Sequence, residues 1–166
     1  RSEEDEVYFE PETTLQNFRL TTDGNIEKQE IPLYNLETCS GLVSLFRDPA
    51  KQKPVNHIRI PGLTKCDGAI SVSGDNMYPL LQAGDLVLYK QISDIGGGIF
   101  WGEMYLLSID LDGNEYIIIR YIQKSEKSEF IKLVSYNRAY SDQDIPIEKV
   151  NALALIKAWI RISSMK

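Results

Sequence analysis

The chain has 166 residues, of which 43% are hydrophobic and 25% charged, and this composition is typical of one globular domain and excludes global disorder. The net charge of −6 argues against a surface that wraps a nucleic-acid backbone, because phosphate binding requires an excess of Lys and Arg on one face. No segment is apolar over the length of a membrane span, and Cys39 and Cys66 are isolated. We therefore expect a cytoplasmic protein without disulfides, metal or cofactor.

Residues 1–30 are mainly polar and are expected to form an arm or linker, with a hairpin-like turn at Asp23-Gly24-Asn25. Residues 31–166 are expected to form the domain proper. The alternation of apolar and polar side chains over residues 31–36 predicts a strand. Because Pro32 has no amide hydrogen, either this strand lies at a sheet edge or Pro32 lies at the start of the strand.

From residue 55 onward the chain is a succession of short apolar or alternating runs that end at Gly, Pro or Asp. They predict strands over residues 55–60, 69–72, 85–89, 103–109, 115–122, 130–134 and 152–162. Asp112-Gly113 is the strongest hairpin signal. The last run contains enough Ala for a helix, but its alternating Ile residues favour a strand. About eight short strands and no long amphipathic helix predict a mainly β domain with a coiled sheet or a barrel.

Three features resemble functional motifs but do not meet their requirements. Residues 110–114 look like a calcium loop, yet Ile119 occupies the twelfth position, where a bidentate Glu is needed. Gly96-Gly97-Gly98 is not followed by a helix start, so a phosphate cradle is not predicted. His57 has no nearby nucleophile or metal ligand, and we assign it no catalytic role.

The most informative stretch is Gly74-Asp75-Asn76-Met77-Tyr78-Pro79, followed by Gly84-Asp85-Leu86-Val87. A turn between two strands explains the composition of this stretch. It does not explain the order Gly-Asp-x-Met-x-Pro and then Gly-Asp with two hydrophobic residues. That order resembles the nucleophile segment of LexA-like and phage-repressor-like self-cleaving domains and of related signal peptidases, in which a Ser stands between the Asp and the Met.

Four further segments resemble this family in the same order along the chain. Ile31-Pro32-Leu33 precedes Ser40-Gly41, which is similar to the cleavage loop, and the other three are residues 58–61, 101–105 and 133–140. Each segment alone is weak evidence, and the collinear order over roughly residues 30–162 carries the resemblance. The fold that it implies is LexA/signal-peptidase-like, with coiled β-sheets around an SH3-like barrel.

In this family a neutral Lys takes the proton of the Ser hydroxyl, which attacks the peptide bond. Asn76 stands at the nucleophile position, and Arg120 stands at the position of the Lys. A carboxamide is not an acyl acceptor, and a guanidinium stays protonated at physiological pH. Lys124 is four residues further on, a shift of about 13 Å along a strand. We therefore expect no functional catalytic residue: Asn76 would cap a turn, and Arg120 would hold its head group at the surface.

The resemblance implies the C-terminal dimerisation and regulatory domain of a bacterial or prophage transcriptional repressor. A helix-turn-helix domain would precede Arg1 and make all contacts with DNA. The last run is apolar on both faces, so it is either sandwiched in the core or packed on a partner. The resemblance favours a homodimer interface that includes Trp159 and Ile160.

Two alternatives stay open. The first is an active Ser-Lys autopeptidase that carries a Ser-to-Asn change and uses a Lys elsewhere in the chain. The second is a UmuD-like accessory protein, which has the same domain after a short arm. The residues that precede Arg1 would discriminate between a repressor and an accessory protein.

Overall fold

The computed structural model describes residues 29–163, so the expected turn at Asp23-Gly24-Asn25 lies outside the described residues. The chain divides into two compact units. The smaller unit comprises Arg1–Glu30 and Ile58–Lys65, and in its described part Arg59 forms an ion pair with Glu30. The larger unit comprises Ile31–His57 and Cys66–Lys166 and contains every feature of the site.

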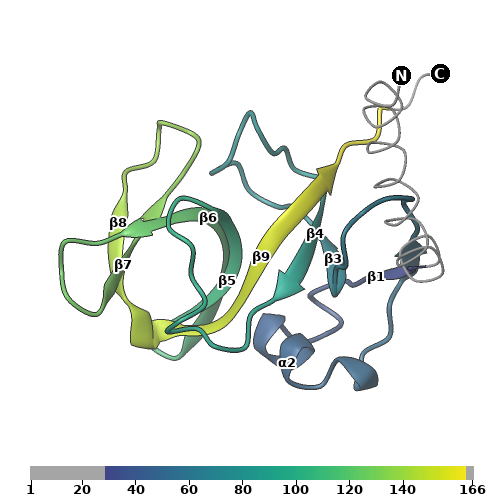
Figure 1. Cartoon of the computed structure of the whole chain (residues 1–166), viewed down its shortest axis with the longest axis horizontal. Coiled ribbons are helices and arrows are strands. Elements are labelled where there is room, and N and C mark those ends of the chain that lie inside the picture. Colours follow the sequence, from purple (N-terminus) through teal and green to yellow (C-terminus); the bar gives the residue numbers. More distant parts are fainter. Residues whose placement is uncertain (1–28, 164–166) are drawn as a thin grey trace, which may run out of the picture. The chain divides into compact units, whose positions relative to one another are not determined.

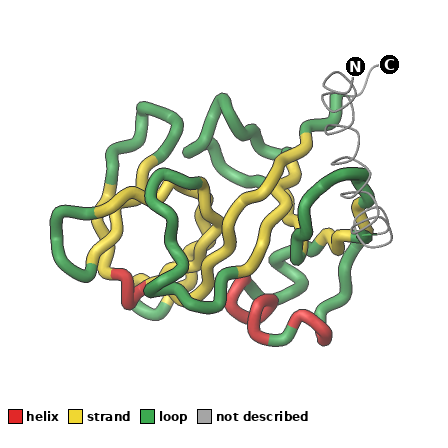
Figure 2. The backbone as a smooth tube through the Cα atoms, viewed as in Figure 1, coloured by secondary structure: helices red, strands yellow, loops and turns green. Residues whose placement is uncertain are grey.

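Strands dominate the described residues (Figures 1 and 2), which confirms the mainly β prediction. They form one nine-stranded sheet in the order β2-β1-β3-β4-β9-β5-β6-β7-β8. Figure 1 shows β9 crossing between β4 and β5, its neighbours in the sheet. The strands are β1 (Ile31–Leu33), β2 (Asn56–Ile58), β3 (Gly68–Ser71), β4 (Leu86–Gln91), β5 (Met104–Leu111), β6 (Asn114–Lys124), β7 (Phe130–Val134), β8 (Gln143–Pro146) and β9 (Val150–Ile160).

The hairpin predicted at Asp112-Gly113 joins β5 to β6, as expected. Asp112 and Gly113 have positive φ angles of 57° and 82°. A two-residue hairpin turn requires positive φ at both residues so that its twist matches that of the two strands. The side chain of Asp110 accepts a hydrogen bond from the Gly113 amide at 2.9 Å. These contacts are local, which explains why the sequence signal was sufficient.

Three elements differ from the prediction. Strand β1 ends at Leu33 because the chain turns away from the sheet over residues 36–41. Helix α2 (Leu42–Arg47) and strand β8 were not predicted. Helix α2 is only six residues long, and a helix this short depends on tertiary contacts rather than on its own propensity. Two 3-10 turns, η1 (Pro49–Lys51) and η2 (Ile147–Lys149), complete the described elements.

The last strand, β9, confirms the choice of strand over helix, and its first part is buried between β4 and β5. Within residues 29–163 no helix has the length and apolar character to cross a membrane.

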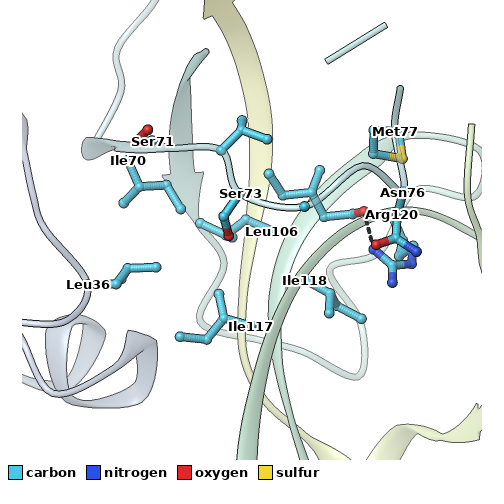
Figure 3. A pocket seen from close by; sticks show the side chains of 13 residues that line it. Leu36, Ile70, Ser71, Ser73, Asn76, Met77, Leu106, Ile117, Ile118 and Arg120 are labelled. Carbon is cyan, nitrogen blue, oxygen red and sulfur yellow. Dashed lines mark hydrogen bonds between the residues drawn. The ribbon is translucent and has the colours of Figure 1, made fainter. Parts of the chain in front are cut away.

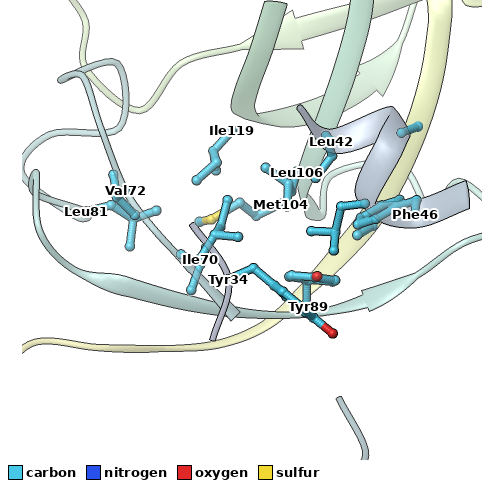
Figure 4. Packing of buried hydrophobic residues seen from close by; sticks show 14 of the residues in the cluster. Tyr34, Leu42, Phe46, Ile70, Val72, Leu81, Tyr89, Met104, Leu106 and Ile119 are labelled. Atoms are coloured by element: carbon cyan, nitrogen blue, oxygen red, sulfur yellow. The ribbon is translucent and has the colours of Figure 1, made fainter. Parts of the chain in front are cut away.

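Two apolar clusters form the core. The first includes side chains of α2 and of Tyr34, the residue after β1 (Figure 4), and in it the rings of Phe46 and Tyr89 lie 5.3 Å apart. The second lies within the curve of β5 to β9. Each fully buried aliphatic side chain contributes about 1.5–3 kcal/mol. The first cluster also includes Ile70, Val72, Met77, Leu106 and Ile119, whose side chains line the pocket described below.

Candidate functional site

A tight turn after β3 holds the motif that the sequence singled out. Gly74 has a φ of 83°, a left-handed conformation that glycine adopts without steric cost. The amide of Tyr78 donates to the carbonyl of Asp75 at 3.1 Å and closes the turn. The side chain of Met77 is buried in the first cluster and anchors the turn to the core. Asn76 is thereby held at the tip, half-buried.

The segment after β7 clamps this turn from the outside. The backbone amide of Asn137 donates to the Asn76 carbonyl at 2.8 Å, and its side chain donates to the Asp75 carbonyl at 2.9 Å. The Tyr140 hydroxyl donates to the Asp75 carboxylate at 2.6 Å. Two motifs that lie more than 60 residues apart in the sequence therefore form one structure.

The side-chain amide of Asn76 takes no part in this clamp. Within residues 29–163 it has no hydrogen-bond partner, so the expected bond between this side chain and nearby backbone is absent from the described part of the chain. The backbone of Asn76, not its carboxamide, is what the fold uses.

Arg120 lies on β6, opposite Tyr105 of β5, and is half-buried. One guanidinium nitrogen donates to the neighbouring carbonyl of Ile119 at 2.8 Å. Burial lowers the pKa of Arg120, an effect that nearby Tyr140 partly opposes. Among residues 29–163 no carboxylate forms an ion pair with Arg120. The expected surface position of its head group is therefore only partly realised.

Asn76 and Arg120 line the same pocket, which has a volume of about 270 Å³. Figure 3 shows both side chains at one end, and apolar side chains, including Leu36 and Ile117, toward the other. Among residues 29–163, no lysine and no histidine lines this pocket. Its lining residues are Leu36, Ile70, Ser71, Val72, Ser73, Gly74, Asn76, Met77, Leu106, Ile117, Ile118, Ile119 and Arg120.

The sequence of the chain was compared with models of known protein families. The model of the family described as Peptidase S24-like matches residues 37–156, a span that includes both sides of the pocket. The chain belongs to the Peptidase S24-like family. The match confirms the resemblance that was inferred from the order of the motifs. The comparison with curated proteins found no match.

The second half of the S24-like motif has a structural role. Asp85 is only 4% exposed, and its carboxylate accepts two hydrogen bonds from Arg161, at 3.0 and 2.8 Å, and one from the Gln82 amide at 2.9 Å. The hydrogen bonds from Arg161 lower the pKa of Asp85. Gly84, with a φ of 96°, allows the chain to turn into β4. Sequence reasoning missed Arg161 because nothing local marks it as a partner of Asp85.

The segment that resembles a cleavage loop does not line the S24-like pocket. Ser40 and Gly41 lie immediately before α2 with φ angles of 61° and 101°. A Cβ atom at Gly41 would lie 2.1 Å from a carboxylate oxygen of Glu115 and would displace this side chain, and the φ of 101° also favours glycine.

Glu115 also holds the start of α2. Its carboxylate accepts hydrogen bonds from the amides of Leu42 and Val43, at 3.1 and 3.0 Å, and from the Ser108 hydroxyl at 2.6 Å. Glu115 precedes Arg120 by five residues on β6, which corresponds to roughly 16 Å along a strand. The structure therefore brings Asn76 and Arg120 together and leaves the Ser40–Gly41 bond outside their pocket.

The remaining candidates lie elsewhere. Lys124 is exposed near the end of β6, opposite Ile131, and does not line the pocket. Among the described residues no group of three or more His, Cys, Asp or Glu side chains is arranged to hold a metal ion. At the end of β9, Trp159 is 42% exposed and Ile160 is half-buried.

Proposed function

We propose that this S24-like chain is a non-catalytic dimerisation and regulatory domain of a bacterial or prophage transcriptional repressor. The observation that supports this most strongly is the pairing of Asn76 with Arg120 in one pocket. By resemblance these are the positions of the nucleophilic Ser and the basic Lys. Their shared pocket supports the residue-by-residue correspondence, because a nucleophile and its base must lie within reach of each other.

The pocket lacks the chemistry of a Ser-Lys dyad. Asn76 has no hydroxyl group, and Arg120 remains protonated at physiological pH even though burial lowers its pKa. Ser71 and Ser73 also line the pocket, but no lysine or histidine of the described part of the chain lines it with them. A serine without a general base is a weak nucleophile at neutral pH. The pocket therefore lies where the dyad of the family would lie, but its residues do not supply the nucleophile and the base that self-cleavage requires.

The chain is expected to remain uncut when it is incubated at alkaline pH, a condition that promotes deprotonation of a catalytic lysine. Mass spectrometry over time should show one intact species of 18.9 kDa. Asn76→Ala is the matched control, because any cleavage that it shares with the wild type does not depend on the side chain of Asn76. A fragment pair cut after Ser40 in the wild type, absent from Asn76→Ala, would contradict the proposal.

The charge of the chain supports the assignment of DNA binding to another domain. A net charge of −6 disfavours contact with a polyanion, so a repressor containing this domain would use a basic domain upstream of it. A repressor that reads a two-fold operator also needs a two-fold symmetric dimer, which this domain would supply.

The exposed end of β9 is our candidate for the dimer interface. Trp159 is 42% exposed and Ile160 is half-buried, and large aromatic side chains are enriched among the anchors of interfaces. Ile162, which follows β9, is 76% exposed. Analytical ultracentrifugation at micromolar concentration should show a dimer for the wild type and a shift toward monomer for Trp159→Ala. Trp101→Ala is the control, because Trp101 is 48% exposed on a loop after β4 and should leave the dimer intact. A monomeric wild type would remove the dimer from the proposal, and a folded Trp159→Ala dimer would place the interface elsewhere.

A further inference from the structure

Arg120 carries a positive charge that no described group neutralises. It is half-buried, it forms no ion pair within residues 29–163, and its one described hydrogen bond goes to the adjacent carbonyl of Ile119. A guanidinium has five N–H donors, so most of its donors are available. A charge that is partly removed from water without a partner costs free energy, which an incoming anion would offset.

The pocket beside this charge combines two kinds of surface. At one end lie the guanidinium of Arg120 and the carboxamide of Asn76, for which the described residues provide no hydrogen-bond partner. At the other end lie Leu36, Ile70 and Ile117 (Figure 3). Its volume of about 270 Å³ is slightly below that of typical ligand pockets in proteins, which begin at roughly 300 Å³. The space therefore suits a small molecule or the last residue of a peptide.

We propose that this pocket binds a small aliphatic carboxylate. The carboxylate would accept two hydrogen bonds from the guanidinium of Arg120 and one from the amide of Asn76, and the alkyl group would lie among the apolar side chains. This inference rests on the proposed function, because a pocket without a Ser-Lys dyad can hold a ligand without cutting it.

The charge and the lining together select this class of ligand. Arg120 is the only cationic residue among the described residues that line the pocket. Its single charge matches the single negative charge of a carboxylate better than the two charges of a phosphate. Carbohydrates would leave their hydroxyl groups without partners against Leu36, Ile70 and Ile117. A carboxylate with a branched alkyl group satisfies both ends of the pocket.

Two sources can supply this chemistry, a free carboxylic acid and the C-terminal leucine of a peptide. Isothermal titration of the 166-residue chain with 4-methylpentanoate, and separately with an N-acetylated dipeptide that ends in leucine, distinguishes them. The matched neutral probes are 4-methylpentanamide and the amidated dipeptide. At least one carboxylate should bind, and the corresponding amide should bind about tenfold more weakly or not at all.

Variants locate the binding site. Arg120→Gln should weaken binding of the carboxylate about tenfold or more, because it removes the charge. Lys124→Gln is the control, since it removes an exposed charge from the same strand outside the pocket and should change nothing. Ser73→Leu changes an exposed residue that lines the pocket, and its added bulk should weaken binding while the charge stays in place.

The proposal is supported if one carboxylate binds, its neutral amide does not, and Arg120→Gln weakens the binding. The carboxylate that binds then identifies the source of the ligand. The proposal is overturned by equal binding of the amides, by unchanged binding in both Arg120→Gln and Ser73→Leu, or by no binding at about 10 mM ligand. Circular dichroism verifies that each variant is folded. The intact mass measured after the titration tests the absence of cleavage separately, so a failure of ligand binding leaves the proposed function standing.

Discussion

The double variant Asn76→Ser, Arg120→Lys is expected to cleave itself slowly after Ser40 at alkaline pH, whereas Asn76→Ser alone stays intact. The single change supplies a hydroxyl group but leaves a permanent cation where the base must be. The second change supplies an amine that can lose its proton. General base catalysis contributes at least roughly a hundredfold in rate, so the two variants should differ by about this factor or more.

The environment of Arg120 supports this expectation. Burial lowers the pKa of Arg120, and the same burial would lower the pKa of a lysine there from its ordinary value of about 10.4. The cleavage rate of the double variant should therefore rise with pH as the amine loses its proton. The rate should remain low, because Glu115 holds the loop outside the pocket and the loop must leave this contact before the bond can be attacked.

Gel electrophoresis and mass spectrometry over a pH series measure this result. The control Arg120→Lys has the amine without the hydroxyl group and should stay intact. Cleavage by Asn76→Ser alone would show that another residue acts as the base, and the chain would then be an autopeptidase that carries a Ser-to-Asn change.

Asp85→Asn is expected to lower the free energy of unfolding by roughly 2 kcal/mol, because it weakens a buried hydrogen-bonded pair. Asp85, directly before β4, is bonded to Arg161, directly after β9, and its carboxylate accepts three hydrogen bonds. Denaturant unfolding of the wild type and the variant measures the difference. Asp142→Asn is the control, since Asp142 is exposed and its substitution should change stability little.

The same pair predicts a dependence on pH. Arg161 lowers the pKa of Asp85 in the folded chain, so the unfolded chain binds the proton more readily. The contribution of Asp85 to stability is therefore present in full above its unfolded pKa of about 3.9 and is lost as the pH falls through the lower, folded pKa. The difference between wild type and Asp85→Asn should be constant near neutral pH and narrow below about pH 4. A difference that stays unchanged at lower pH would argue against this pairing.

Local sequence patterns were sufficient wherever the determining contacts are local. The short, mainly apolar run over residues 130–134 predicted β7 with its observed bounds, and Asp112-Gly113 predicted the hairpin between β5 and β6. The alternating Ile residues of β9 identified a strand despite its Ala content. The order of the motifs was sufficient to identify the family, because it depends on residue types and spacing alone.

Long-range contacts decided the rest, and no local pattern encodes them. Helix α2 begins where Glu115, 73 residues away from Leu42, accepts its first amides. The turn at Asn76 is clamped by Asn137 and Tyr140, and Asp85 meets Arg161, 76 residues further on.

The sequence by itself therefore determined the fold class and the family, and it led to the proposal that Asn76 and Arg120 stand at the dyad positions. Only the tertiary structure decided that Asn76 and Arg120 line one pocket, that no described carboxylate neutralises Arg120, and that Ser40–Gly41 lies outside the pocket. The reason is physical: periodicity and turn chemistry act over a few residues, whereas the order in which strands pair brings distant side chains together.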